Sequence, residues 1–421
     1  MATAITYHKT FYGTEEKRIT LPIFFLLVYV VCTFYPQIYP FFPFLGTYSA
    51  VLIAGWGLLI SYLMTREKYH NPTAYKNPIF KAWIGFLIVL IFGIIFSADR
   101  GRSQDTAIVC LKYFLIFLVM IKIIDSGKRL DFLFGIFASC GVGMAISSIY
   151  NYVIGESWFG GMKSYAVEVG IFGDPNDLGL LLNSTLPFAF YFLLKGGKKL
   201  IPITGTALIT TAIIVSFSRG AFVGFCAILF GFYQIIGRKF KKQIITLLLA
   251  ILLVFMFAPG GHLERMQTIY SWEVSEETGL TATRLDMWIP NFMWCLQNPV
   301  FGIGAGLSSY VNGRVSNDWH STHNAPLQVL TEIGFIGLYF YILLFIIPFG
   351  YYRQIMKKGI KLSNEDLLRM RVILISLIGF AATAFFLPQA YSPILFLISG
   401  FAVIQAELIS KRKLIKNERN N

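Results

Sequence analysis

Residues 79–97 have the sequence IFKAWIGFLIVLIFGIIFS, in which Lys81 is the only charged side chain. A helix of about 20 mainly apolar residues is long enough to cross the hydrocarbon core of a bilayer. Similar apolar runs recur from Leu21 almost to the C-terminus, separated by short polar breaks. They predict about twelve membrane-spanning helices, at residues 21–37, 44–64, 79–97, 104–121, 131–154, 176–194, 200–217, 220–237, 243–258, 324–350, 369–387 and 391–408.

The composition indicates that most of the chain lies in lipid. Of its 421 residues, 56% are apolar and only 14% are charged, which does not suit the surface of a soluble protein. No stretch is left over for a soluble domain, so we predict a single all-α integral membrane domain over residues 1–421. The first apolar run is not followed by an A-x-A-like cleavage site, and we therefore expect it to remain as a span.

The net charge of +14 would make nucleic acid the first partner to consider for a soluble protein. Here, however, 28 of the 36 Lys and Arg residues lie in one alternate set of gaps or within three residues of it, 7 lie in the opposite set, and Lys112 lies well inside a span. Because basic residues are retained on the cytoplasmic side, both termini are predicted to be cytoplasmic. The basic excess then faces anionic lipid headgroups, and no nucleic-acid partner is expected.

One gap predicted to face outward, residues 259–323, is several times longer than the others, and we predict that it is a large outer loop with short interfacial helices. A helix is expected to begin at Thr283, with Asp286 three residues later. Its apolar residues share one face, as in a helix that lies among lipid headgroups, although Pro290 would distort it. These residues are Leu285, Trp288, Ile289, Phe292, Met293 and Leu296.

Two patterns are interpreted as having no chemical role. Residues 301–306, FGIGAG, look like a dinucleotide-binding fingerprint, but no βαβ unit surrounds them, so we interpret them as a flexible turn. The five cysteines include no C-x-x-C pair and predict no disulfide framework. Four of them lie in apolar runs, and Cys295 alone is expected to be exposed.

The outward gaps contain three candidates for substrate chemistry. Arg219 lies in the tight turn Ser218-Arg219-Gly220 at the predicted outer boundary, where it could bind a phosphate or act only as an interfacial anchor. Arg284, at the start of the loop helix, could bind a second phosphate or remain solvated. His323 lies directly before a span, and histidine's ordinary pKa of about 6.5 makes it a candidate general base, although an inert surface histidine fits equally well.

Other polar residues have a structural interpretation beside the functional one. His320 and His323 could bind a metal at their i, i+3 spacing, but no Cys, Asp or Glu lies beside them, so no metal site is predicted. Glu332 and Lys112 each lie inside a predicted span and are expected to pair with one another rather than to hold a polyanionic headgroup. Asp174, which a proline follows, is expected to cap a helix rather than to bind a metal.

Three ordered groups of residues resemble the O-antigen ligase and O-antigen polymerase superfamily. The resemblance is specific over residues 170–345, and the first five predicted spans contribute topology only. The groups are Ser218-Arg219-Gly220; Arg284-x-x-x-Trp288 with Asn298-Pro299 and Gly302-x-Gly304-x-Gly306; and His323-Asn324-x-x-Leu327-x-x-x-x-Glu332-x-Gly334-x-x-Gly337.

The resemblance implies a GT-C-like fold and an inverting, metal-independent glycosyltransferase without a cofactor. Such an enzyme moves a glycan from undecaprenyl (polyprenyl) pyrophosphate to an acceptor hydroxyl at the outer face of the bacterial cytoplasmic (inner) membrane. By this resemblance, His323 is the base on the acceptor hydroxyl, and Arg219 and Arg284 hold the pyrophosphate. Further candidate substrate-binding residues are His320, Asn324 and Lys112.

The acceptor distinguishes the two activities of this superfamily. A ligase of lipopolysaccharide biosynthesis uses lipid A core, whereas a polymerase extends another lipid-linked repeat; chain length and loop placement favour the ligase. A solute transporter would show internal repeats and broken helices with polar groups at mid-membrane, but the polar groups here gather at the outer boundary. A purely structural scaffold would explain neither Arg219 nor His323.

Overall fold

The computed structural model describes residues 19–39, 42, 46, 49–69, 72–155, 172, 174–236, 284–316 and 321–420. Within these ranges every regular element is a helix, which confirms the predicted all-α class for this part of the chain. The predicted span 243–258 and residues 259–283 and 317–320 of the large outer loop, which include His320, lie outside the described residues.

Eleven of the twelve predicted spans correspond to observed helices, and the number twelve itself stays a prediction. Eight of the described helices are long and apolar enough to cross a membrane, and α2, α4 and α9 are shorter. The helices are α2 (Leu21–Phe34), α4 (Ala50–Thr65), α5 (Pro78–Phe96), α6 (Arg100–Ile123), α7 (Gly127–Ile154), α8 (Pro175–Lys195), α9 (Leu200–Val215), α10 (Arg219–Gly231), α13 (Arg284–Gln297), α14 (Ser308–Ser316), α15 (Ala325–Lys357), α16 (Asn364–Ala384) and α17 (Pro393–Asn420). The π-helical turn η4 (Phe232–Ile236) continues α10.

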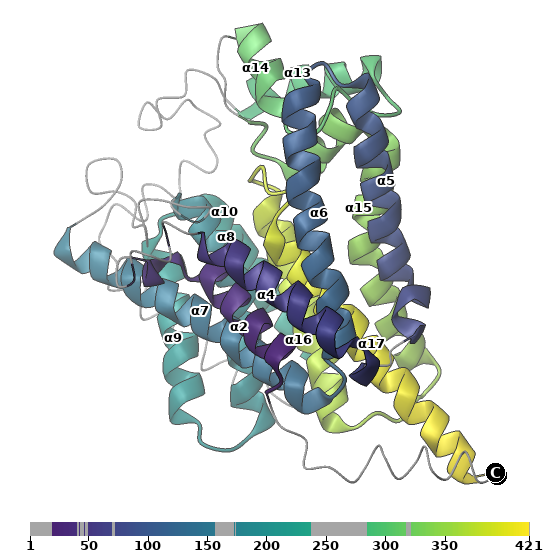
Figure 1. Ribbon diagram of the computed structural model, residues 1–421. Coiled ribbons are helices and arrows are strands. Elements are labelled where there is room, and N and C mark those ends of the chain that lie inside the picture. The colour runs from purple at the N-terminus through teal and green to yellow at the C-terminus, as the bar shows by residue number, and fades with distance from the viewer. Residues whose placement is uncertain are drawn as a thin grey trace.

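Helices α8 and α16 form the centre of the bundle. They pack against each other and against α10, and α8 also packs against α7 and α9. Small residues allow this close approach: a Cβ added to Gly179 would lie 2.3 Å from Ala221 Cβ, and one added to Gly224 would lie 1.9 Å from Thr383 Oγ1. In Figure 1, α7 to α10 lie on one side of α16 and α17, and α5, α6 and α15 lie on the other.

Large apolar side chains are exposed along the outward faces of several helices. Ile88, Phe92 and Ile95 lie on one face of α5, and Phe335 and Tyr339 are exposed on α15. Such long apolar surfaces are rare on soluble proteins and are the surfaces that lipid covers. Together with the long apolar helices, they indicate an integral membrane protein.

Contacts join described gaps at two ends of the bundle. At one end, called the outer end here, Asn176 contacts Ser218 and Asp177 contacts Gln389. At the other end, called the inner end, ion pairs join Lys195, Arg369 and Arg412, which come from three of the basic gaps, to buried acids. Residues 238–242, another basic gap, lie outside the described residues, and the membrane side that each end faces stays a prediction.

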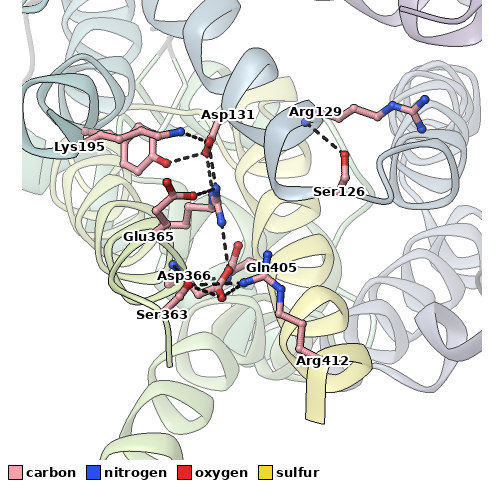
Figure 2. Close-up of polar contacts among 11 residues, drawn as sticks. Ser126, Arg129, Asp131, Lys195, Ser363, Glu365, Asp366, Gln405 and Arg412 are labelled. Atoms are coloured by element: carbon pink, nitrogen blue, oxygen red, sulfur yellow. Dashed lines mark hydrogen bonds and ion pairs between the residues drawn. The ribbon is translucent and has the colours of Figure 1, made fainter. Parts of the chain in front are cut away.

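A buried ion cluster joins four helices at the inner end (Figure 2). Arg369 on α16 donates to Asp131 on α7, with Nε–Oδ1 and Nη2–Oδ2 distances of 2.6 and 2.9 Å, and to Asp366, with an Nη1–Oδ1 distance of 3.0 Å. Lys195 on α8 also pairs with Asp131, and Arg412 on α17 pairs with Asp366. Each buried carboxylate thus has at least two cationic partners, as buried charges require.

Candidate active site

The outer end of α10 places Arg219 beside α8. Ser218 caps α10: its Oγ accepts from the backbone N–H of Ala221 at 3.2 Å and donates to Asn176 Oδ1 at 2.6 Å. Phe217, two residues before Arg219, has a φ of 51°, which is uncommon for a residue with a side chain. Arg219 is therefore the first residue of a helix whose start is tied to the start of α8.

Gly220, the residue after Arg219, lets the loop between α16 and α17 approach closely, as expected for a glycine. A Cβ added to Gly220 would lie 3.1 Å from the Cβ of Phe386, which belongs to the loop between α16 and α17. Glycine at this position lets the two backbones approach each other. The start of α10 consequently packs against that loop.

His323 lies at the start of α15 in a strained backbone conformation. Its φ is 45°, and its side chain is partly buried. Asn324 caps α15 by accepting from the N–H of Leu327 at 2.8 Å, and Thr322 Oγ1 donates to the carbonyl of Asn324 at 3.2 Å. Left-handed conformations at non-glycine residues cost about 1–3 kcal/mol and persist only where neighbouring contacts hold them.

Trp288 of α13 supplies one of those contacts. Its indole N–H donates to the carbonyl of Thr322 at 2.8 Å, and its ring packs edge-to-face on Phe385 with a centroid distance of 5.9 Å. The predicted loop helix is confirmed, and Pro290 lies inside it without ending it. Nothing is described of the Arg284 side chain or of Thr283.

The amphipathic pattern of α13 is confirmed, but Cys295 was predicted on the wrong face of this helix. Met287, Asn291 and Cys295 face the protein, whereas Ile289 and Phe292 are exposed, as expected for a helix that rests in lipid. The expectation that Cys295 is exposed is therefore wrong. It failed because the apolar stripe of α13 faces away from the bundle.

The exposed cysteine is Cys226 on α10, which had been expected to behave as an interior apolar group.

Helix α15 is broken at Gly334, where φ is 73° and ψ is −173°. The break leaves backbone groups without helical partners, and these must be satisfied within the protein. The carbonyls of Thr331 and Glu332 accept from the N–H groups of Ile303 and Gly304 at 3.0 and 2.9 Å. The residues before the break, 325–333, thus form a short buried segment, called α15a here.

The glycine-rich stretch is a rigid support for this break. A Cβ at Gly302 would lie 2.4 Å from the carbonyl carbon of Glu332, and one at Gly334 would lie 2.3 Å from the oxygen of Val300. The interpretation of residues 301–306 as a flexible turn is wrong, because close packing and hydrogen bonds hold them in place. The absence of a dinucleotide fold around them is confirmed within the described, all-helical residues.

Glu332 is completely buried and does not pair with Lys112. Its carboxylate accepts from the backbone N–H of Gly306 at 2.7 Å, from the N–H of Ser308 at 3.0 Å and from Tyr391 Oη at 2.8 Å. Lys112 is exposed on α6 instead. The predicted ion pair is wrong because backbone amides and a hydroxyl satisfy this carboxylate.

Burial and the neighbouring Glu332 carboxylate raise the pKa of Tyr391 well above its ordinary value. The hydroxyl of Tyr391 therefore keeps its proton and donates a hydrogen bond to Glu332.

The loop between α16 and α17, residues 385–392, contacts α8, α10, α13 and α15a, and the sequence did not predict this role. Its sequence, FFLPQAYS, had been assigned mostly to the ends of two spans. The polar residues and the proline between two apolar runs were the available signal. The loop contacts are Phe385 with Trp288, Phe386 with Gly220, Gln389 with Asp177, Ala390 with Gln328 and Tyr391 with Glu332.

Residues 204–342 match the family model described as O-Antigen ligase (Wzy_C). Over these residues the chain is similar to the O-antigen ligase family. The match confirms the resemblance inferred from the sequence, and it includes Arg219, Trp288, His323 and Glu332. Among curated proteins, no match to the chain was found.

Within the matched residues 204–342, α10 and α15a both begin near the 385–392 loop. Helix N-termini carry a partial positive charge and unpaired N–H groups, so two of them in one region favour an anionic ligand. The start of α10 reaches the loop through Phe386, and the His323 segment reaches it through Trp288 and Phe385. Lys112 is not brought into these contacts, and Asn324 uses its side-chain oxygen as a helix cap.

Proposed function

We propose that the protein is a membrane glycosyltransferase that moves a glycan from undecaprenyl (polyprenyl) pyrophosphate to an acceptor hydroxyl, and that it acts as an O-antigen ligase on lipid A core. The site is assigned to the outer face of the cytoplasmic membrane, in a GT-C-like arrangement of helices. One observation carries the proposal: the segments that bear His323 and Arg219, far apart in the sequence, pack through Trp288 and Gly220 on adjacent residues of one loop.

The chemistry assigned to these residues is a direct displacement. The acceptor oxygen attacks the anomeric carbon of the donor sugar while His323 accepts the hydroxyl proton. The bond between that carbon and the pyrophosphate oxygen breaks, and the pyrophosphate leaves with the bonding electrons. Attack from the face opposite the leaving group inverts the anomeric configuration.

Arg219 and Arg284 are assigned to the pyrophosphate. A guanidinium donates two parallel N–H bonds to a phosphate and keeps its charge at all working pH values. Fixed cations placed where negative charge develops lower the barrier by several kcal/mol in a water-poor site. The partial charge at the start of α10 adds to this effect. The proposal therefore needs no metal or cofactor.

Backbone strain at His323 supports a chemical role for this residue. A surface histidine without a role has no reason to occupy a φ of 45° between two hydrogen-bonded neighbours. Strained residues of this kind gather where a side chain must be aimed precisely enough for reaction or binding.

The test uses the purified full-length protein in lipid vesicles with a polyprenyl-pyrophosphate glycan as donor. One arm supplies lipid A core, and a second arm supplies another lipid-linked repeat. We expect transfer to lipid A core. Transfer only to the lipid-linked repeat would identify a polymerase instead, and no transfer in either arm would refute glycosyltransfer from this donor.

Variants of the site separate catalysis from folding. His323→Ala and Arg219→Ala should abolish transfer while leaving the protein folded and membrane-inserted. Arg314→Ala is the matched control, because Arg314 is an exposed outward-gap arginine on α14, where its guanidinium lies over the ring of Tyr310. Full transfer activity in either site variant would contradict the assigned roles.

A further inference from the structure

Glu332 is a buried acid to which the displacement chemistry assigns no step. It lies on α15a nine residues after His323, and none of its side chain is exposed. Its carboxylate joins α15a to two other segments: the residues that lead into α14, through Gly306 and Ser308, and the 385–392 loop, through Tyr391. A buried charge costs several kcal/mol in desolvation and is tolerated only when such donors surround it.

We propose that Glu332 is a positioning residue, which holds α15a between the glycine stretch and the 385–392 loop and thereby fixes His323 in its strained conformation. This inference rests on the proposed function for the role of His323. The hydrogen bonds of the carboxylate support the inference, because three of its four donors come from segments other than α15a. The fourth donor comes from α15a itself. That one is Gln328, whose Nε2 lies 3.4 Å from Glu332 Oε1.

Gln328 extends the same support by one helical turn toward His323. Its side-chain oxygen accepts from the N–H of Ala390 at 3.1 Å, so two side chains of α15a hold the 385–392 loop. The break at Gly334 makes this support necessary, because α15a is too short to stay in place without tertiary contacts. Both ends of α15a are thus held: the His323 end by Trp288 and the other end by Glu332.

A carboxyl group fits this arrangement because each of its two oxygens accepts from a backbone N–H group. Its two oxygens accept from the N–H groups of Gly306 and Ser308 and from the hydroxyl of Tyr391 at the same time. Glutamine has nearly the same shape but would turn an N–H₂ group toward one of these donors. Glu332→Gln should therefore release α15a without leaving a cavity, and Glu332→Asp should restore part of the support by keeping both acceptor oxygens.

The first measurement is hydrogen exchange of the amides in residues 324–333, which needs no enzymatic activity. Exchange there should be faster in Glu332→Gln than in the wild-type protein, with Glu332→Asp between them. Peptides around Arg369 at the inner end should be unchanged. Glu365→Gln is the matched control, because Glu365 is half exposed at the inner end. Unchanged exchange in residues 324–333 of Glu332→Gln would overturn the proposal.

The second measurement is the steady-state kinetics of glycan transfer. A displacement of about 1 Å at a catalytic group lowers the rate about 100-fold, so kcat of Glu332→Gln should fall by that order while the donor KM changes little. Tyr391→Phe, which removes one donor, should lower kcat less, and Glu332→Asp should recover part of kcat. A wild-type kcat in Glu332→Gln would overturn the proposal. An equal loss of kcat in Glu332→Gln and Glu332→Asp, together with faster hydrogen exchange throughout the bundle, would also overturn it, because it would indicate general unfolding.

The two measurements also separate this inference from the proposed function. If the wild-type protein transfers no glycan to any acceptor, the proposed function fails. The exchange result for residues 324–333 then still decides whether Glu332 holds α15a.

Discussion

Replacing Arg369 with methionine removes the cation that pairs with both Asp131 and Asp366 in the inner-end cluster. Only 2% of the Arg369 side chain is exposed, and its guanidinium donates to Asp131, Asp366 and Glu365. Methionine keeps an unbranched apolar stem like that of arginine but lacks the guanidinium, so the substitution removes the charge and its hydrogen bonds.

The size of the expected loss in stability depends on which cationic partners Asp131 and Asp366 keep after the substitution. Removing one partner of a buried ion pair costs about 3–5 kcal/mol because the remaining charge is left without compensation. Asp131 keeps Lys195, and Asp366 keeps Arg412, so neither acid is fully stranded. Glu365 is 56% exposed, and its contribution is small because water screens it. We expect the free energy of unfolding to fall by about 3 kcal/mol, the lower end of that range.

The assay is denaturation of the full-length protein in mixed micelles by increasing SDS, followed by circular dichroism. Arg353→Met, at an exposed arginine near the end of α15, should change the unfolding free energy by less than about 0.5 kcal/mol. Adding Asp131→Asn and Asp366→Asn to Arg369→Met should recover much of the loss, because no buried charge is then left unpaired. The reasoning is refuted if Arg369→Met is as stable as the control, or if the triple variant is no more stable than Arg369→Met.

Three further changes test other parts of the structure. Gly334→Ala should lower the unfolding free energy by about 3 kcal/mol, because a Cβ there meets Val300 O in a left-handed conformation; wild-type stability would contradict the helix break. Trp288→Phe keeps the aromatic ring but loses the bond to Thr322, so transfer should fall several-fold while stability drops by about 1 kcal/mol; unchanged transfer would mean that this bond does not hold His323. Arg412→Ala removes a half-exposed charge and should cost less than about 1 kcal/mol in the SDS titration; a loss equal to that of Arg369→Met would contradict the screening argument.

Much of the fold could be predicted because it depends on local chemistry. Apolar runs located eleven of the helices, and Asp174 marked a helix start, as the hydrogen bond from the Asn176 N–H to its carboxylate confirms. Basic residues of three gaps, Lys195, Arg369 and Arg412, meet at one end of the bundle, as the charge alternation predicts. Each of these signals acts within a few residues or through the membrane itself, so each is visible in one sequence.

The partners of buried polar groups could not be predicted in the same way. Glu332 and Lys112 both require partners if buried, and pairing them was the simplest guess from the sequence. Helix rotation decided otherwise: Lys112 is on the exposed side of α6, while Cys110, two residues earlier, is buried. Hydropathy gives no rotation angle for a helix that is apolar on all sides.

The sequence by itself indicated a helical membrane chain with Arg219 and His323 in outward-predicted gaps and a resemblance to the O-antigen ligase family, which the match over residues 204–342 supports. The tertiary structure alone decided that the 385–392 loop lies against both segments, that α15 breaks at Gly334 and that Glu332 supports the break. The physical reason is that these features depend on backbone groups that must find partners across the bundle. Residue type and spacing do not specify which distant segment supplies them.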